Sequence, residues 1–196
     1  MGRLVVCERK TLETYVRVEF NLDGSGFSDV KTGHPFFDHM LETLSKHSLI
    51  DLKISADSLK TPSIHHVVED VALTIGEALD KSLGDRKGIL RFGFAIIPMD
   101  DALAEVSLDV SGRPYIHVED RFVGFTEGLD FSLVKHFLRS LAQSGKLTIH
   151  VPRIYGEDAH HVFEALFKAL AVALREACKV VTENRSGIPS TKGVLT

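Results

Sequence analysis

Two short stretches combine paired histidines with a glutamate at the same spacing. His65-His66 is followed by Glu69, and His160-His161 is followed by Glu164. Each stretch opens a long segment with the apolar periodicity of an α-helix. Imidazole nitrogens and carboxylate oxygens are donors that divalent metal ions bind in proteins. Both stretches are therefore candidate metal-binding sites.

A third histidine accompanies each pair. His39 precedes His65 by 26 residues, and His136 precedes His160 by 24 residues. The second set follows the first by 97 residues at His136 and by 95 residues at His160, nearly half of the 196-residue chain. An offset of this size indicates an internal duplication that carries three histidines and one glutamate in each copy.

Helical geometry restricts how these side chains can share an ion. Residues four positions apart lie on one face, so His65 and Glu69 can bind together, as can their counterparts in the second copy. The second histidine of each pair, His66 or His161, points about 100° away. We therefore predict two metal ions. Each ion would bind one His–Glu pair and further histidines, which gives four protein ligands per ion. Six-coordinate ions would keep two positions open for water or substrate, as catalytic sites do.

A simpler interpretation is a pair of helices with polar first turns. Ser63 and Asp158 are suitable caps, and acidic residues favour helix N-termini. That interpretation suffices for any one of these histidines alone. The duplicated set favours the metal site.

The elements that position these residues repeat in the same order, and each half is predicted as β-β-β-α-β-α. We expect an α+β two-layer sandwich by internal duplication, with helices on one face of a mostly antiparallel sheet. One catalytic domain is expected over 1–196, with pseudo-repeats at about 1–88 and 89–184 and a C-terminal tail at 185–196. The expected helices cover 36–47, 65–83, 131–144 and 159–183. The expected strands cover 3–9, 12–20, 27–32, 49–55, 92–99, 102–110, 115–122 and 146–151, with a loop at 154–157.

Composition limits the class of protein. The chain is 44% hydrophobic and 26% charged, with a net charge of −4 and no run of like charges. These values are typical of a globular protein and give no indication of a nucleic-acid or membrane partner. Cys7 and Cys178 lie far apart and suit free thiols in a reducing compartment. Because no signal-peptide pattern and no long apolar run is present, we expect a cytoplasmic protein.

Several other polar residues have a simple structural explanation or are candidates to bind an anion. Glu13 lies on the polar side of an expected strand, where a solvated strand face is the alternative. Arg91, Arg113, Lys168 and Lys192 are candidates to bind an anionic group. His47 ends an expected helix, and a favourable contact with the helix dipole is a sufficient reason for a histidine at that position. The Gly-, Ser- and Pro-rich tail has a composition typical of disorder.

The chain resembles the imidazoleglycerol-phosphate dehydratase family of histidine biosynthesis over nearly its whole length. Several motifs in order and at spacing carry the resemblance: Asn21-Leu22-Asp23-Gly24, Phe37-Asp38-His39-Met40-Leu41, His65-His66 with Glu69-Asp70, Arg86-Lys87-Gly88, Ser111-Gly112-Arg113-Pro114-Tyr115, His160-His161 with Glu164-Ala165, and Ser190-Thr191-Lys192-Gly193. It departs from the family's usual pattern at Ser63-Ile64, where an acidic pair is common, and at Val67, where Thr is common.

The resemblance implies a hydro-lyase that converts D-erythro-imidazole-glycerol phosphate to imidazole-acetol phosphate. It implies two Mn²⁺ per active site, whereas six imidazoles alone would have suggested zinc or iron. The implied metal ligands are His39, His65, His66, Glu69, His136, His160, His161 and Glu164. The implied phosphate-binding positions, which replace the expectation of a disordered tail, are Arg91, Arg113, Ser190 and Lys192, with Thr191 keeping a hydroxyl beside them. The implied substrate contacts are Glu13, His47 and Lys168. The implied assembly is of trimers packed into a 24-subunit homo-oligomer, with metal sites at subunit contacts.

The chemistry of this reaction explains the need for metal. The departing hydroxyl is on the carbon attached to the imidazole, and the hydrogen lost is on the next, weakly acidic carbon. An imidazole that has lost its N–H proton can expel hydroxide to give a diazafulvene-type intermediate, and bound cations favour that proton loss. A base then removes the neighbouring hydrogen, and we predict that this base is Glu13. Two other classes of protein are alternative interpretations of the same histidines: a metal-storing assembly and a dinuclear phosphoester hydrolase.

Overall fold

The computed structural model describes residues 3–60, 64–119, 122–181 and 187–195. Its first half forms a sheet in the order β1-β2-β4-β3, antiparallel except for the parallel pair of β3 and β4. Helices α1 and α2 flank β4 along the chain. The elements are β1 (Leu4–Lys10), β2 (Thr14–Asn21), β3 (Ser28–Lys31), α1 (Pro35–Ser48), β4 (Asp51–Ser58) and α2 (Ile64–Leu83).

The second half repeats this topology. Its sheet has the order β5-β6-β10-β7, again with one parallel pair, β7 with β10. A two-stranded hairpin of β8 and β9, which has no counterpart among the described residues of the first half, precedes α3. The elements are β5 (Phe92–Met99), β6 (Ala102–Asp109), β7 (Tyr115–Val118), β8 (Phe125–Thr126), β9 (Leu129–Asp130), α3 (Phe131–Gly145), β10 (Thr148–Tyr155) and α4 (Ala159–Cys178). The predicted α+β fold with a duplicated half is therefore confirmed.

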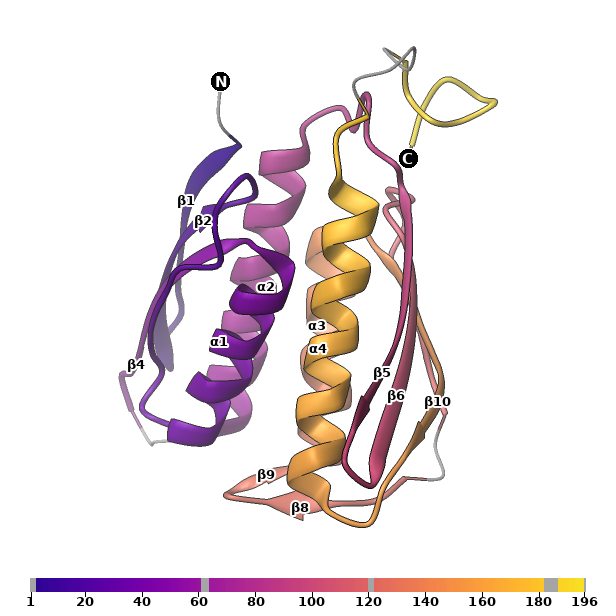
Figure 1. Cartoon of the computed structure of the whole chain (residues 1–196). Coiled ribbons are helices and arrows are strands. Elements are labelled where there is room, and N and C mark those ends of the chain that lie inside the picture. The colour runs from indigo at the N-terminus through magenta and orange to yellow at the C-terminus, as the bar shows by residue number, and fades with distance from the viewer. Residues whose placement is uncertain (1–2, 61–63, 120–121, 182–186, 196) are drawn as a thin grey trace.

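The helices of both halves lie between the two sheets (Figure 1). Helix α2 packs on β1 and β2 of its own half, and α4 packs on β5 and β6. Across the middle of the molecule the halves interlock, because α1 contacts α4 and α2 contacts α3. The halves thus share one core, and each pair of helices at the centre joins one copy to the other.

Local sequence explains these elements. In β2, alternation buries Val16, Val18 and Phe20 against the helices, and each such side chain contributes about 1.5–3 kcal/mol of hydrophobic free energy. Helix α1 begins with Pro35, which suits a first turn because its missing N–H needs no partner there. The apolar face of this helix is buried, since Met40 and Leu41 are both fully inaccessible.

The expected bounds differ in several elements: the strand expected over 115–122 ends at Val118, and the one expected over 49–55 covers Asp51–Ser58. Helix α4 ends at Cys178 and not near 183, because the chain becomes extended at Lys179 and Val180 pairs with Ile89. Strand β10 continues to Tyr155, through part of the expected loop. Glu13 lies in the bend just before β2, not within a strand. Among the described helices, none is both long and apolar enough to cross a bilayer.

Candidate metal centres and phosphate cleft

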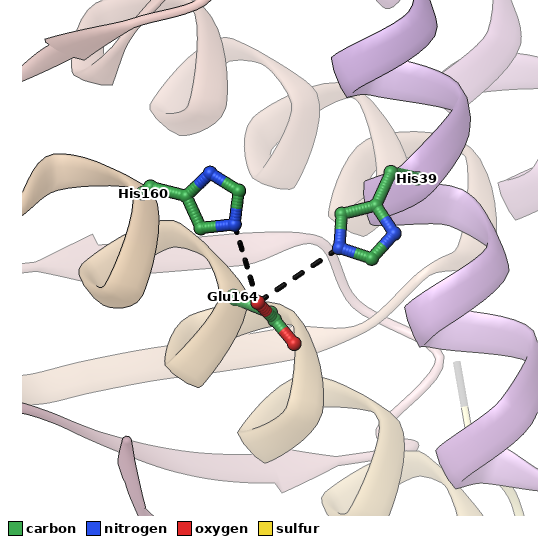
Figure 2. Close-up of side chains that lie close together, drawn as sticks. All are labelled: His39, His160 and Glu164. Atoms are coloured by element: carbon green, nitrogen blue, oxygen red, sulfur yellow. Dashed lines mark ion pairs between the residues drawn. The ribbon is translucent and has the colours of Figure 1, made fainter. Parts of the chain in front are cut away.

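The first candidate metal centre joins α1 of one half to α4 of the other. His39 comes from α1, and His160 and Glu164 come from successive turns of α4 (Figure 2). The Glu164 Oε2 atom lies 3.4 Å from Nε2 of His160 and 3.8 Å from Nε2 of His39. These donor atoms all lie within 4.8 Å of one another, close enough to converge on one ion.

The second centre has the same composition on α2 and α3. His65 and Glu69 come from α2, and His136 comes from α3 with its ring stacked on His65 at 4.6 Å between centroids. The Nε2 atom of His136 lies 3.7 Å from Oε1 of Glu69. That nitrogen is buried and has no hydrogen-bond partner among the described residues. An unpaired buried nitrogen is costly, so a metal ion fits this donor set well.

The second histidine of each pair has other neighbours. Nδ1 of His66 lies 3.4 Å from Oε2 of Glu13. Nδ1 of His161 lies 2.6 Å from Oδ1 of Asp101. That hydrogen bond raises the pKa of His161 and holds the pKa of the Asp101 carboxyl well below its usual range. Within one chain, neither histidine belongs to the two three-residue centres, as the helical geometry predicts.

Polar residues surround the first centre. Lys168 Nζ lies 2.8 Å from Oε1 of Glu164. Glu127 is at the tip of the β8–β9 hairpin, and its Oε1 lies 3.1 Å from Nδ1 of His160. Burial would raise the pKa of Glu164, but Lys168 and the two imidazoles outweigh it and the net pKa is lowered. Burial lowers the pKa of His47, and the charge of Lys168 lowers it further. The charge of Lys168, which pairs with Glu164 of this centre, therefore acts on the imidazole of His47.

The predicted phosphate-binding residues gather in a different place. Arg91, Arg113 and the tail line a cleft of about 750 Å³, to which Ser190, Thr191 and Lys192 all contribute. Arg91 is held there by Asp109, and its Nη1 donates to the carbonyl of Pro189 at 2.8 Å. The tail is thus tied to the domain over 187–195, contrary to the expectation from composition.

The cleft and the metal centres lie at opposite ends of the molecule. Figure 1 shows the tail where the helices finish, whereas β8, β9 and the start of α4 lie at the other end. Arg91 bonds through its backbone N–H to Ala177 in the last turn of α4, while His160 is in the first turn. Because α4 has 20 residues, about 30 Å separates its ends.

The sequence interpretation missed three acidic residues of these sites. Asp101 lies in the β5–β6 turn, Glu127 in the β8–β9 turn, and Asp109 beside Arg91. The duplication contained a signal for Asp101, because Asp101 directly precedes β6 as Glu13 directly precedes β2. Of the departures from the family's pattern, Val67 is buried in the core, and Ser63 lies outside the described residues.

Fold and sites together define a duplicated α+β protein with two His–His–Glu centres suited to metal. The family model described as imidazoleglycerol-phosphate dehydratase matches residues 32–174. A relative of that name from Frankia casuarinae is 49% identical over the full length of both chains, and one from Thermodesulfovibrio yellowstonii is 45% identical over 95% of this chain and 96% of its own.

Solved structures agree with these relatives. The protein of Pyrococcus furiosus is 41% identical with a TM-score of 0.83, covering 96% of this chain and all of that one. That of Staphylococcus aureus is 32% identical with a TM-score of 0.73, covering 90% and 99%. The chain belongs to the imidazoleglycerol-phosphate dehydratase family and is a hydro-lyase.

Proposed function

We propose that this chain removes water from D-erythro-imidazole-glycerol phosphate to give imidazole-acetol phosphate, a step of histidine biosynthesis. Family membership supports the reaction. The observation that carries the chemistry is the pair of His–His–Glu centres, each built from both halves, with an unpaired buried nitrogen on His136. A substrate with an azole at one end and a phosphate at the other suits both the centres and the cationic cleft.

The proposed cofactor is Mn²⁺, with two ions per active site. One ion would be held by His39, His160 and Glu164, and the other by His65, Glu69 and His136. We propose that His66 and His161 supply the fourth ligands from neighbouring subunits. The ions would hold the substrate imidazole and lower the pKa of its N–H group. The choice of manganese rests on the resemblance of the sequence to the family.

The side chains of this protein would then carry out the remaining steps. Glu13 is 52% exposed, and its carboxylate lies 3.4 Å from His66, a proposed metal ligand. We propose that it removes the hydrogen from the carbon next to the one that loses hydroxide, through a diazafulvene-type intermediate. Lys168 and His47 would contact the substrate beside the first centre. The resulting enol becomes the ketone after release of water.

The phosphate would be bound by the cleft at the other end of the chain. Arg113, Lys192 and the hydroxyls of Ser190 and Thr191 offer donors there, with Arg91 fixed by its ion pair with Asp109. Since about 20–25 Å of α4 separates Ala177, beside this cleft, from Glu164 and His160 of the first metal centre, one substrate cannot contact both within a chain. The geometry therefore supports active sites shared in a homo-oligomer, for which we propose trimers arranged as a 24-mer in the cytoplasm.

The substitution Glu13→Gln tests the role of the base. We expect kcat to fall by roughly 10²–10⁴-fold, while manganese content measured by mass spectrometry stays unchanged. Glu8→Gln is the matched control, because Glu8 is an exposed partner of Arg17 on β1 and such pairs contribute little. Near-normal turnover of Glu13→Gln would remove Glu13 from the reaction. Release of inorganic phosphate by the wild type, in place of loss of water, would indicate a phosphoester hydrolase.

A further inference from the structure

The duplication places one carboxylate beside the second histidine of each pair. Glu13 is the residue just before β2, and Asp101 is the residue just before β6, the corresponding strand. Glu13 approaches Nδ1 of His66 at 3.4 Å, and Asp101 approaches Nδ1 of His161 at 2.6 Å. The two carboxylates are therefore structural counterparts, but only the second makes a short hydrogen bond to its imidazole.

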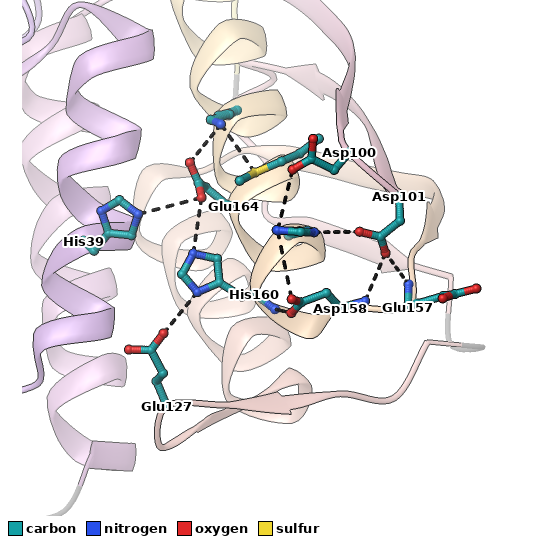
Figure 3. A network of polar contacts seen from close by, with 11 residues as sticks. His39, Asp100, Asp101, Glu127, Glu157, Asp158, His160 and Glu164 are labelled. Carbon is teal, nitrogen blue, oxygen red and sulfur yellow. Dashed lines mark hydrogen bonds and ion pairs between the residues drawn. The ribbon is translucent and has the colours of Figure 1, made fainter.

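Asp101 is also fixed from behind. Its Oδ2 atom accepts the backbone N–H groups of Glu157 and Asp158 at 2.5 and 3.0 Å (Figure 3). Asp158 in turn begins α4, because its side chain accepts the N–H of His160. One oxygen of Asp101 thus holds the loop that starts the ligand-bearing helix, which leaves the other oxygen aimed at His161.

This arrangement determines which imidazole nitrogen carries the proton. An ionised carboxylate only accepts hydrogen bonds, so Nδ1 of His161 must donate. In a neutral imidazole the lone pair is then on Nε2, the atom that a metal ion needs. The carboxylates on the Nε2 side, Asp100 and Asp158, lie 3.7 and 4.0 Å away, beyond hydrogen-bond distance.

We propose that Asp101 is a positioning residue that holds His161 in the tautomer and orientation required to bind manganese through Nε2. This inference rests on the proposed function, because it takes His161 as a metal ligand. The two halves have then diverged in role. The shorter Asp101, held by two backbone amides, orients a ligand, whereas the longer Glu13 makes a looser contact and is available for proton transfer.

The substitution Asp101→Asn tests the role with little change of shape. The asparagine oxygen can still accept the two backbone amides, but its NH₂ group then faces Nδ1 of His161. Nδ1 must accept that hydrogen bond, and the proton moves to Nε2, where it blocks the metal. We expect Mn²⁺ affinity, measured on the metal-free protein from the electron paramagnetic resonance signal of free Mn²⁺, to fall about 10–100-fold at one class of site.

Asp100→Asn is the matched control. It removes the same charge one residue away, but Asp100 is 76% exposed and makes no contact with Nδ1. Because Asp100 lies 3.7 Å from Nε2 but is exposed, we expect a loss of manganese affinity of at most about threefold, well below that of Asp101→Asn. In a His161→Gln background, Asp101→Asn is expected to cause no further loss, because the ring on which it acts is gone.

Three results would overturn the proposal. The first is a Mn²⁺ affinity of Asp101→Asn equal to that of the wild type. The second is a loss of affinity for Asp100→Asn as large as that for Asp101→Asn. The third is a further loss of affinity when Asp101→Asn is added to His161→Gln. If Asp101→Asn does not fold, as judged by circular dichroism, Asp101→Glu replaces it. This variant keeps an acceptor and is expected to bind manganese with near-native affinity, so a tenfold loss there would also refute the role. Failure of the wild type to bind manganese would overturn the proposed function itself. Manganese binding by the wild type with no loss in Asp101→Asn would overturn only the role of Asp101.

Discussion

Adjacent histidines serve different purposes in each copy, because neighbouring side chains on a helix point about 100° apart. His160 faces Glu164 and His39 across the junction of α1 and α4, whereas His161 faces the β5–β6 turn and Asp101. One residue step therefore directs one imidazole to the three-residue metal centre and the other to the turn before a strand, although His160 and His161 are similarly exposed, at 32% and 28%. This division agrees with sites completed by a second chain.

Burial suppresses the reactivity of one residue outside these sites. Removal from water raises the pKa of the Cys178 thiol to about 12, from an ordinary value of 9.0. We predict that iodoacetamide at pH 8 leaves Cys178 unmodified in the native protein and alkylates it in urea, as measured by peptide mass spectrometry. The thiolate is the reactive form, and it is scarce when the pKa is this high.

The same residue contributes a dependence of stability on pH. Its pKa is higher in the folded chain, so the unfolded chain loses the thiol proton first as pH rises above about 9. The contribution of Cys178 to the free energy of unfolding is complete below that pH and declines above it. Alkylation of Cys178 at equal rates in native and unfolded protein would contradict both expectations.

At the scale of elements, close contact between helices of different halves sets the geometry of the metal centres. Gly76 on α2 lies against Gly145 at the end of α3, and a Cβ on Gly76 would lie 2.7 Å from the backbone nitrogen of Gly145 and 2.8 Å from the carbonyl oxygen of Leu141. Those neighbours are backbone atoms and cannot rotate away. The absence of a side chain at this position therefore allows α2 and α3 to approach.

We predict that Gly76→Ala separates these helices. Overpacking of this kind costs about 1–3 kcal/mol, measurable as a lower urea midpoint. Because His65 and Glu69 are on α2 and His136 is on α3, the same substitution is expected to weaken manganese binding at that centre. Gly187→Ala is the control, since a Cβ at Gly187 meets nothing within 4 Å. Unchanged stability of Gly76→Ala would show that the helices can shift without cost.

The order of the elements and the grouping of ligands by duplication could be predicted because they depend on periodicity and spacing. The end of α4 could not, because the helical pattern continues past Cys178 while the pairing of Val180 with Ile89 is a tertiary contact. The contact between Glu127 and His160 was likewise unpredictable, since it depends on where a short hairpin folds back. Which histidine would join which His–Glu pair followed only from the packing of α1 on α4 and of α2 on α3.

At the scale of the whole molecule, helices α1, α2, α3 and α4 begin near the end that carries the metal centres, and the phosphate cleft lies at the end where α4 finishes (Figure 1). Glu13 lies beside His66 at the former end, and Lys192 lines the cleft at the latter. If active sites are shared as we propose, a chain with an intact Glu13 would serve a chain with an intact Lys192. Sharing of this kind gives a test that does not depend on the size of the assembly.

We predict that Glu13→Gln and Lys192→Ala chains, each nearly inactive alone, recover activity when they are co-expressed. In a random one-to-one mixture, a site that takes Glu13 from one chain and Lys192 from another has both residues intact in about a quarter of cases. Dehydratase activity of the purified hybrid should approach that fraction of the wild-type value. A hybrid no more active than the mean of its two parents would show that each site is complete within one chain, against the separation of about 20–25 Å along α4. A chain that carries both substitutions, purified in the same way, supplies the baseline.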